Sequence, residues 1–273
     1  MDAIFLWPTW FIVAVLLAAM FAANEAGYLL GRRPLRSPSE ASRSTSNMLK
    51  ASIFGLVGFL LAFSFSATSS RHDARRRVVL EEANAIGTCY LRADLLNAPD
   101  GQRIRHVLRD LVSTRLDYFT NAKDPIVAAR AVQDLNRLED ELWIAVETTV
   151  RTDQQLAHTS QIIPAANAVI DLNSTREWVT ASHLQPVVLG VLILGVIVSS
   201  LLVGHSSGEA GQRHTGMWIA FNLLFGLVLY VLLDFDRPRR GLIQVNHAPL
   251  IELFETMQQS SPVADQHVVP ATP

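Results

Sequence analysis

Four long apolar runs dominate the hydrophobic pattern of this chain, at residues 4–23, 53–67, 187–203 and 217–233. A helix needs about 20 apolar residues to cross the hydrocarbon core of a bilayer. The first run meets this length, the third and fourth reach its short end, and the second needs Leu49 or Thr68 to reach it. None of the runs contains a charged residue, which favours four transmembrane helices over the alternative, buried helices of a soluble protein.

A long segment between the second and third runs has the spacing of polar and apolar residues that is typical of α-helices. In two stretches the apolar residues recur at intervals of four and three, a seam that faces a partner helix. The seams consist of Val79, Ala83, Ile86, Tyr90 and Ala93, and of Ala131, Leu135, Leu138, Leu142 and Ala145. Residues 97–101 predict a break, and further helices are expected over 102–119, from Pro125 onward and around 153–178.

The pattern therefore predicts an all-α integral membrane protein with four transmembrane helices and a helical extramembrane bundle between the second and third spans. Residues 1–68 hold the first two spans, 69–182 the bundle and 183–236 a hairpin of the last two spans. A membrane-proximal return segment is expected over 237–257, and its apolar spacing predicts a short amphipathic helix from Pro249. The polar tail, residues 258–273, is predicted to be disordered.

Composition supports the membrane interpretation and narrows the function. Hydrophobic residues make up 49% of the chain and charged residues only 18%, whereas about 25% is usual in soluble proteins. The net charge of −2 gives no reason to expect nucleic acid as a partner. The sequence contains no HExxH, Walker or GxGxxG motif, and we predict neither an enzyme nor a bound metal or cofactor.

Residues 71–96, RHDARRRVVLEEANAIGTCYLRADLL, begin a few positions after the second run. Asp73 precedes Arg76 and Arg77 by three and four residues, the spacing of helix-surface ion pairs. Since no Pro or Gly separates the second apolar run from these charges, we expect the second span to continue out of the bilayer. Arg75, Arg76 and Arg77 would then lie at headgroup level as a collar.

Other polar residues lie near the ends of the spans. Asp234, Asp236 and Arg237 end the fourth run, on the same side of the membrane as the collar of Arg75, Arg76 and Arg77. We expect these residues to form a structural charge network at the membrane boundary, with an ion-binding site as the alternative. Asn24 and Glu25 are the polar pair closest to the interior of the first span, and Glu25 lies either at membrane depth or at the interface.

Two blocks, GFLLAFSFS with the charged stretch after it and DFDRPRRGLIQVNHAPL after the last span, resemble the bacterial bestrophin-like domain family. The resemblance extends to about Leu253. That family is remotely similar to bestrophins, which are pentameric anion channels. The resemblance implies a homo-oligomer that conducts small anions, although the arginine- and tryptophan-rich signatures and the acidic calcium clasp of bestrophins have no match here.

The resemblance also implies that the second span lines the pore. In that span Leu56, Phe59, Phe63 and Ala67 follow one another at intervals of 3, 4 and 4 and so share one face. Such a face can also pack against lipid or a neighbouring helix. A non-conducting sensor or scaffold, whose bundle binds a ligand or partner, is therefore the alternative function.

The lipid bilayer is the one partner that the sequence itself requires, and we expect the inner (plasma) membrane. The sequence supports two opposite orientations of the protein in the membrane. Basic residues in the short loops place the bundle outside the cytoplasm, whereas the bestrophin layout and the affinity of an arginine collar for anionic lipid place it inside. We expect a cytoplasmic bundle.

Overall fold

The computed structural model describes residues 7–32, 40–121, 125–152, 155–237 and 243–259. Every regular element within these ranges is a helix, so the all-α prediction is confirmed. Four helical stretches of the described chain are long and apolar enough to cross a membrane, and they contain α1, α2, α6 and α7. The chain is therefore a multi-pass membrane protein. It divides into two compact units, residues 1–73 with 182–244 (the span unit) and residues 74–181 with 245–273 (the bundle unit).

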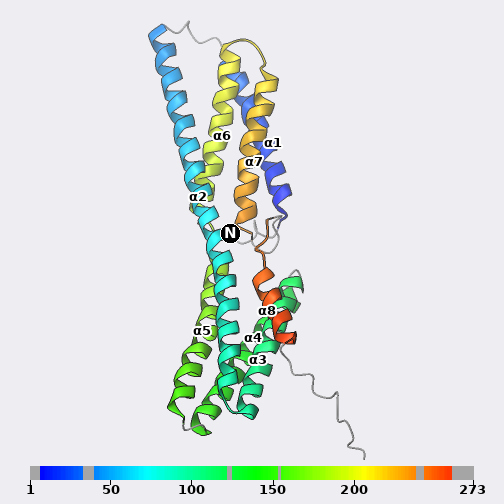
Figure 1. Ribbon diagram of the computed structural model, residues 1–273. Helices are drawn as coiled ribbons and strands as arrows, with labels where there is room; N and C mark the ends of the chain where they lie inside the picture. Colours follow the sequence, from blue (N-terminus) through cyan, green and yellow to red (C-terminus); the bar gives the residue numbers. More distant parts are fainter. Residues whose placement is uncertain (1–6, 33–39, 122–124, 153–154, 238–242, 260–273) are drawn as a thin grey trace, which may run out of the picture. The chain divides into compact units, whose positions relative to one another are not determined.

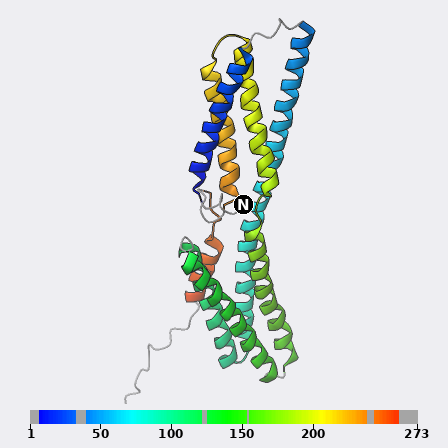
Figure 2. The ribbon, with the colours of Figure 1, turned by 180° about the vertical axis from the view of Figure 1, so that it is seen from behind.

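The span unit contains α1 (Thr9–Gly31), the first part of α2 (Glu40–Arg92), α6 (Pro186–Glu209) and α7 (Thr215–Phe235). Figures 1 and 2 both show α1, α6 and α7 running side by side. Their hydrophobic core includes Met20, Leu192, Val196, Leu229 and Leu232. Because lipid tails are as apolar as these side chains, close packing rather than the hydrophobic effect must hold the spans together.

The helices α6 and α7, over which a hairpin of the last two spans was predicted, follow one another across a short turn. Pro186 occupies the first turn of α6, where its missing N–H leaves no hydrogen bond unmade. At the other end Gly211 has a φ of 69°, a left-handed conformation that glycine adopts without steric cost. Its turn is closed by the N–H of Gln212, which donates to the carbonyl of Ser207 at 3.3 Å.

The bundle unit contains the rest of α2, the short helix η2 (Ala93–Leu95), α3 (Ala98–Asn121), α4 (Pro125–Thr152), α5 (Leu156–Ala181) and α8 (Ala248–Gln259). All five residues of the first predicted seam are buried, as are four of the second, Leu135, Leu138, Leu142 and Ala145. They pack with side chains of α3, α5 and α8 into one core, whose fully buried members include Ile104, Leu108, Ile162 and Leu250.

Some helix boundaries differ from the predictions. The helix α2 begins at Glu40, well before the second apolar run at residue 53; the chain has no Pro or Gly between Pro38 and Gly55, and an acid suits a first helical turn. The helix α1 continues past Ala23 to Gly31. The predicted break at 97–101 instead starts α3, because the side chain of Asn97 caps it by accepting the N–H of Asp100 at 3.2 Å.

The return segment divides between the units at residue 245. Its predicted amphipathic helix is present as α8, in which Leu250 and Met257 are buried. The helix continues to Gln259, so the first two residues of the predicted disordered tail, 258 and 259, are helical; the remainder of that prediction, from residue 260, lies outside the described residues.

Candidate pore helix and buried polar clusters

The face of α2 that was predicted to line a pore is left uncovered by the part of the chain that the structure describes. Leu56, Phe59 and Phe63 are 59%, 67% and 65% exposed, and Ala67 is half-buried at the margin of this face. The residues that α2 buries lie on its other side at intervals of 4, 3 and 4: Val57, Leu61, Ser64 and Thr68. The span therefore has one packed side and one apolar side that needs another surface or lipid.

Close contacts with α6 and α7 hold the packed side of α2. A Cβ atom at Gly195 of α6 would lie 3.0 Å from a methyl group of Val57, so the two helices approach closely there. Phe54 packs edge-on against Phe221 of α7, with ring centroids 6.1 Å apart. The hydroxyl of Thr68 is satisfied within α2, since it donates to the carbonyl of Ser64 at 2.8 Å.

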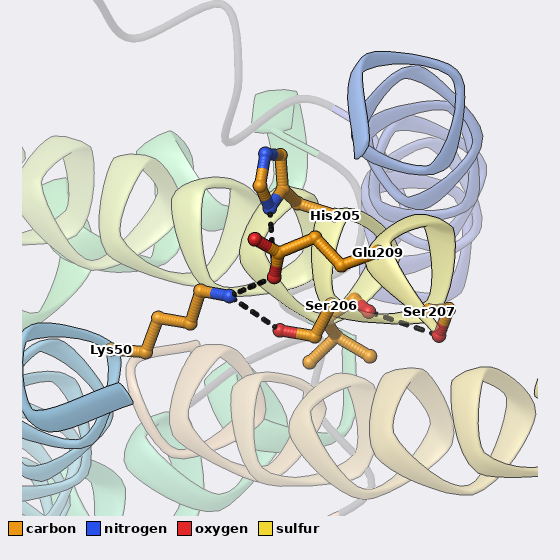
Figure 3. A network of polar contacts seen from close by, with 6 residues as sticks. Lys50, His205, Ser206, Ser207 and Glu209 are labelled. Atoms are coloured by element: carbon orange, nitrogen blue, oxygen red, sulfur yellow. Dashed lines mark hydrogen bonds and ion pairs between the residues drawn. The ribbon is translucent and has the colours of Figure 1, made fainter. Parts of the chain in front are cut away.

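A polar network also joins α2 to α6 (Figure 3). The ammonium group of Lys50 donates to Glu209 Oε2 at 2.7 Å and to Ser206 Oγ at 3.0 Å. His205 Nδ1 lies 3.5 Å from the same carboxylate oxygen. The Lys50 side chain is only 11% exposed, so its charge depends on these partners.

Lys50→Met should weaken the attachment of α2 to α6 moderately. Because Glu209 is 44% exposed and water can replace its partner, we expect a loss of about 1 kcal/mol, or roughly 2–4 °C in Tm. Glu209→Gln should cost a similar amount, and the double variant little more than either single one. Thermal unfolding in detergent measures this, and strictly additive losses would show that the two side chains do not interact.

Glycines on α1 and α6 bring these two helices into backbone contact. Each helix carries a pair of glycines four residues apart: Gly27 and Gly31 on α1, and Gly204 and Gly208 on α6. A Cβ atom at Gly27 would overlap the carbonyl oxygen of Leu201, and one at Gly204 would overlap the backbone of Asn24. This is the small-xxx-small packing that associates helices within membranes.

The polar pair predicted in the first span separates. Asn24 is fully buried at the glycine contact, and neither polar atom of its side chain hydrogen-bonds within the described part of the chain. Glu25 is less buried, and its carboxylate accepts a hydrogen bond from Arg213, in the turn after α6, at 2.7 Å. Glu25 is thus an ion-paired surface residue, whereas Asn24 belongs to the helix–helix contact.

Asp234 and Asp236, at the end of α7, are 1% and 2% exposed. Asp236 Oδ1 accepts a hydrogen bond from the backbone N–H of Leu184 at 2.8 Å. Asp234 Oδ2 accepts one from the N–H of Ile243 at 2.9 Å. These carboxylates therefore join three segments of the span unit, the end of α7, the entrance to α6 and the return segment, which is the geometry of a structural role.

The arginines of the predicted charge network bond to backbone carbonyls. Arg237 donates to the carbonyl of Trp7, ahead of α1. Arg75 is buried, and its Nε donates to the carbonyl of Val179 at 3.4 Å. The two remaining collar residues are exposed: Arg76 and Arg77. That this collar pairs with Asp234 and Asp236 stays a prediction.

Four helices of the bundle unit meet at a buried cluster of charged and amide side chains, which we call the charge hub: Glu82 of α2, Arg115 of α3, Glu139 of α4, and Asn173 and Arg176 of α5. Arg115 Nε lies 2.8 Å from Glu82 Oε1, and Arg176 pairs with the other oxygen of Glu82. Arg115 Nη2 donates to Asn173 Oδ1 at 2.7 Å. Glu82 thereby compensates two guanidinium groups inside the bundle.

One side of the hub is closed by stacked rings. The guanidinium carbon of Arg176 lies 4.3 Å from the ring centroid of Phe119. The imidazole of His247, just ahead of α8, stacks on Phe119 with centroids 3.6 Å apart. Burial, together with the positive charge of Arg176, lowers the pKa of His247 to about 4, so this imidazole is neutral at physiological pH.

Comparison with known proteins gives one match. A family model described as the Bestrophin-like domain matches residues 15–250. The chain belongs to this family. No curated protein and no solved structure matches it. The resemblance found in the sequence is therefore confirmed, and the matched range of this bestrophin-like chain contains both the predicted pore face and the charge hub.

Sequence reasoning missed the hub and the glycine contact of this bestrophin-like chain, although both leave a signal. Arg115 continues the apolar series Ile104, Leu108 and Leu111 of α3 at helical spacing. In α5, polar residues likewise continue a buried series at intervals of 4, 3, 4 and 3: Ile162, Ala166, Val169, Asn173 and Arg176. A polar residue at a buried seam position must find a hydrogen-bond or ion-pair partner inside the bundle. Arg115, Asn173 and Arg176 occupy such positions, and this is the signal by which the sequence could have identified them.

Proposed function

We propose that this bestrophin-like protein is a homo-oligomeric ion channel that conducts small anions, with Leu56, Phe59, Phe63 and Ala67 of α2 lining its pore. The observation that carries the proposal is the uncovered face of α2. Three large apolar side chains at helical spacing are exposed there, while the other side of the helix packs on α6 and α7. Transport rather than catalysis is the proposed activity.

The chemistry of this face suits an anion pore. From Ser52 to Ser70 the helix carries no charged residue, so no carboxylate would repel an anion. A ring of Phe and Leu side chains from several copies would exclude water when narrow and so gate conduction by dewetting. The positive edges of aromatic rings favour an anion over a cation.

A non-conducting sensor or scaffold is the second candidate, and the charge hub favours it. A buried network of charges lowers the stability of a fold relative to apolar packing. A binding or signalling role for the bundle would explain why such a network is retained. In that case the exposed face of α2 would contact lipid and the protein would work as a monomer or dimer.

The proposed setting is the plasma membrane, with the bundle unit in the cytoplasm and the bilayer as its partner. Arg76 and Arg77 are exposed and free to approach anionic lipid headgroups, whose density is highest in the cytoplasmic leaflet.

Reconstitution into liposomes tests the channel proposal. Wild-type protein should conduct chloride in preference to monovalent cations, and its mass in detergent should correspond to several copies. Phe59→Ala with Phe63→Ala removes the largest side chains from the proposed constriction. We therefore expect this double variant to conduct faster and to discriminate less between ions.

Leu224→Ala with Leu227→Ala provides the matched control. These residues of α7 are each 61% exposed and lie nearly one helical turn apart, but they are not on the proposed pore face. Their replacement should leave the flux unchanged. Absence of flux from wild type and from both double variants, together with a monomeric mass, would contradict the channel proposal and favour the sensor.

A further inference from the structure

The charge hub gives its two carboxylates unequal partners. Glu82 contacts Arg115 at 2.8 Å and also pairs with Arg176, so it holds both guanidinium groups. Glu139, the residue through which α4 reaches the hub, lies 3.9 Å from Arg115 Nη2, beyond hydrogen-bond distance. That nitrogen already donates a hydrogen bond to Asn173 Oδ1 at 2.7 Å.

We propose that Glu139 is a proton-binding site through which the packing of α4 in the bundle responds to pH near neutrality. Its side chain is 12% exposed, so an ionised carboxylate there is largely cut off from water, and its nearest cation lies 3.9 Å away. A protonated carboxyl needs neither, because it is uncharged and carries its own donor. Protonation should therefore tighten the contact of α4 with the hub, and ionisation should loosen it.

Charged and polar groups face Glu139 from each helix at the hub. On α3 the facing group is Arg115, which attracts the carboxylate, and on α5 the amide side chain of Asn173 favours its charged form. Glu177 of α5 and Asp140 of α4 repel it. From α2, Glu82 acts indirectly, because it occupies Arg115 and Arg176. One cation at 3.9 Å, set against two repelling acids, leaves the ionised form of Glu139 undercompensated.

The electrostatics agree with this geometry. Burial, and to a smaller extent Glu177 and Asp140, raise the pKa of Glu139 from 4.5 to about 7, against the lowering effect of Arg115 and Asn173. At a pH between 4.5 and about 7, the carboxyl group of Glu139 is therefore protonated in the folded protein and ionised in the unfolded chain. The free energy of unfolding contributed by Glu139 is consequently largest below pH 4.5 and falls as the pH rises to about 7.

His247 titrates with the opposite sign and must be separated from Glu139. Its folded pKa of about 4 lies below the ordinary histidine pKa of 6.5, so its contribution to stability rises with pH across that range. Arg115, with a pKa lowered by burial to about 10, stays charged throughout. Comparing wild type with a variant of Glu139 alone cancels the contribution of His247.

Glu139→Gln tests the proposal, because glutamine keeps the size and the hydrogen-bonding capacity of a protonated carboxyl and cannot ionise. In full-length protein in detergent, the variant should have the Tm of wild type at about pH 5 and a Tm roughly 2–4 °C higher at about pH 8. Glu141→Gln is the control, since Glu141 lies on the same helix, is 47% exposed and pairs with Arg137. Its Tm difference from wild type should not depend on pH.

Hydrogen exchange supplies a second readout. After correction for the intrinsic pH dependence of exchange, amides of α4 in wild type should lose protection between about pH 6 and pH 8, while those of the variant should not. A Tm difference independent of pH, or a variant less stable than wild type at every pH, would overturn the proposal, as would unchanged protection of α4. None of these measurements depends on whether the protein conducts ions.

Discussion

Glu82→Gln is expected to destabilise the bundle unit more than any other single substitution considered for this chain. Glu82 is 1% exposed and is the carboxylate that compensates both Arg115 and Arg176. Glutamine has nearly the same shape but no charge, so two buried guanidinium groups would lose their counter-ion. Breaking a buried ion pair by removing one partner costs about 3–5 kcal/mol. Thermal or denaturant unfolding in detergent should show a loss of this size.

The neighbouring residue provides the control. Glu81 is exposed, so Glu81→Gln removes the same charge from the same turn of α2 without touching the hub, and its stability should change by less than about 1 kcal/mol. If the two variants were equally stable, the hub would not be an ion-paired cluster. Exchange of α3 and α5 amides would locate the damage, because Arg115 and Arg176 lie on these helices.

Gly204→Ala should have the next largest effect, and in the span unit. A single methyl group at this position would overlap the backbone of Asn24, which cannot move away as a flexible side chain can. The helices α1 and α6 would have to separate, with loss of packing along the whole contact. Overpacking usually costs about 1–3 kcal/mol, and a backbone clash belongs at the upper end, which corresponds to roughly 6–12 °C in Tm.

Gly190→Ala on the same helix is the matched control, because a Cβ atom there meets nothing within 4 Å. Alanine favours a helix over glycine by roughly 0.5–1 kcal/mol, so this variant should be as stable as wild type or slightly more so. Similar losses for both variants would indicate that α6 tolerates no substitution for a reason unrelated to α1. Folded yield after purification and thermal unfolding both measure the difference.

Family membership and the location of the spans followed from local patterns. Each apolar run is a property of consecutive residues, and hydrocarbon admits only helices that satisfy their own backbone. The continuation of the second span into the bundle likewise required only that no residue after Ser70 break a helix, and α2 does run unbroken from Glu40 to Arg92. The predictions that were wrong concern helix ends, where a single side chain such as that of Asn97 determines whether one helix ends or the next begins.

The sequence by itself determined that this protein is helical, spans a membrane and buries the seams of its bundle, because hydrophobic periodicity fixes which face of each helix must leave water or meet lipid. It did not determine that Glu82 meets arginines from two other helices, or that Gly204 touches the backbone of Asn24. Such contacts depend on how separate helices cross and in which register, and no local spacing encodes that. Only the tertiary structure decided which polar residues became partners and which face of α2 was left uncovered.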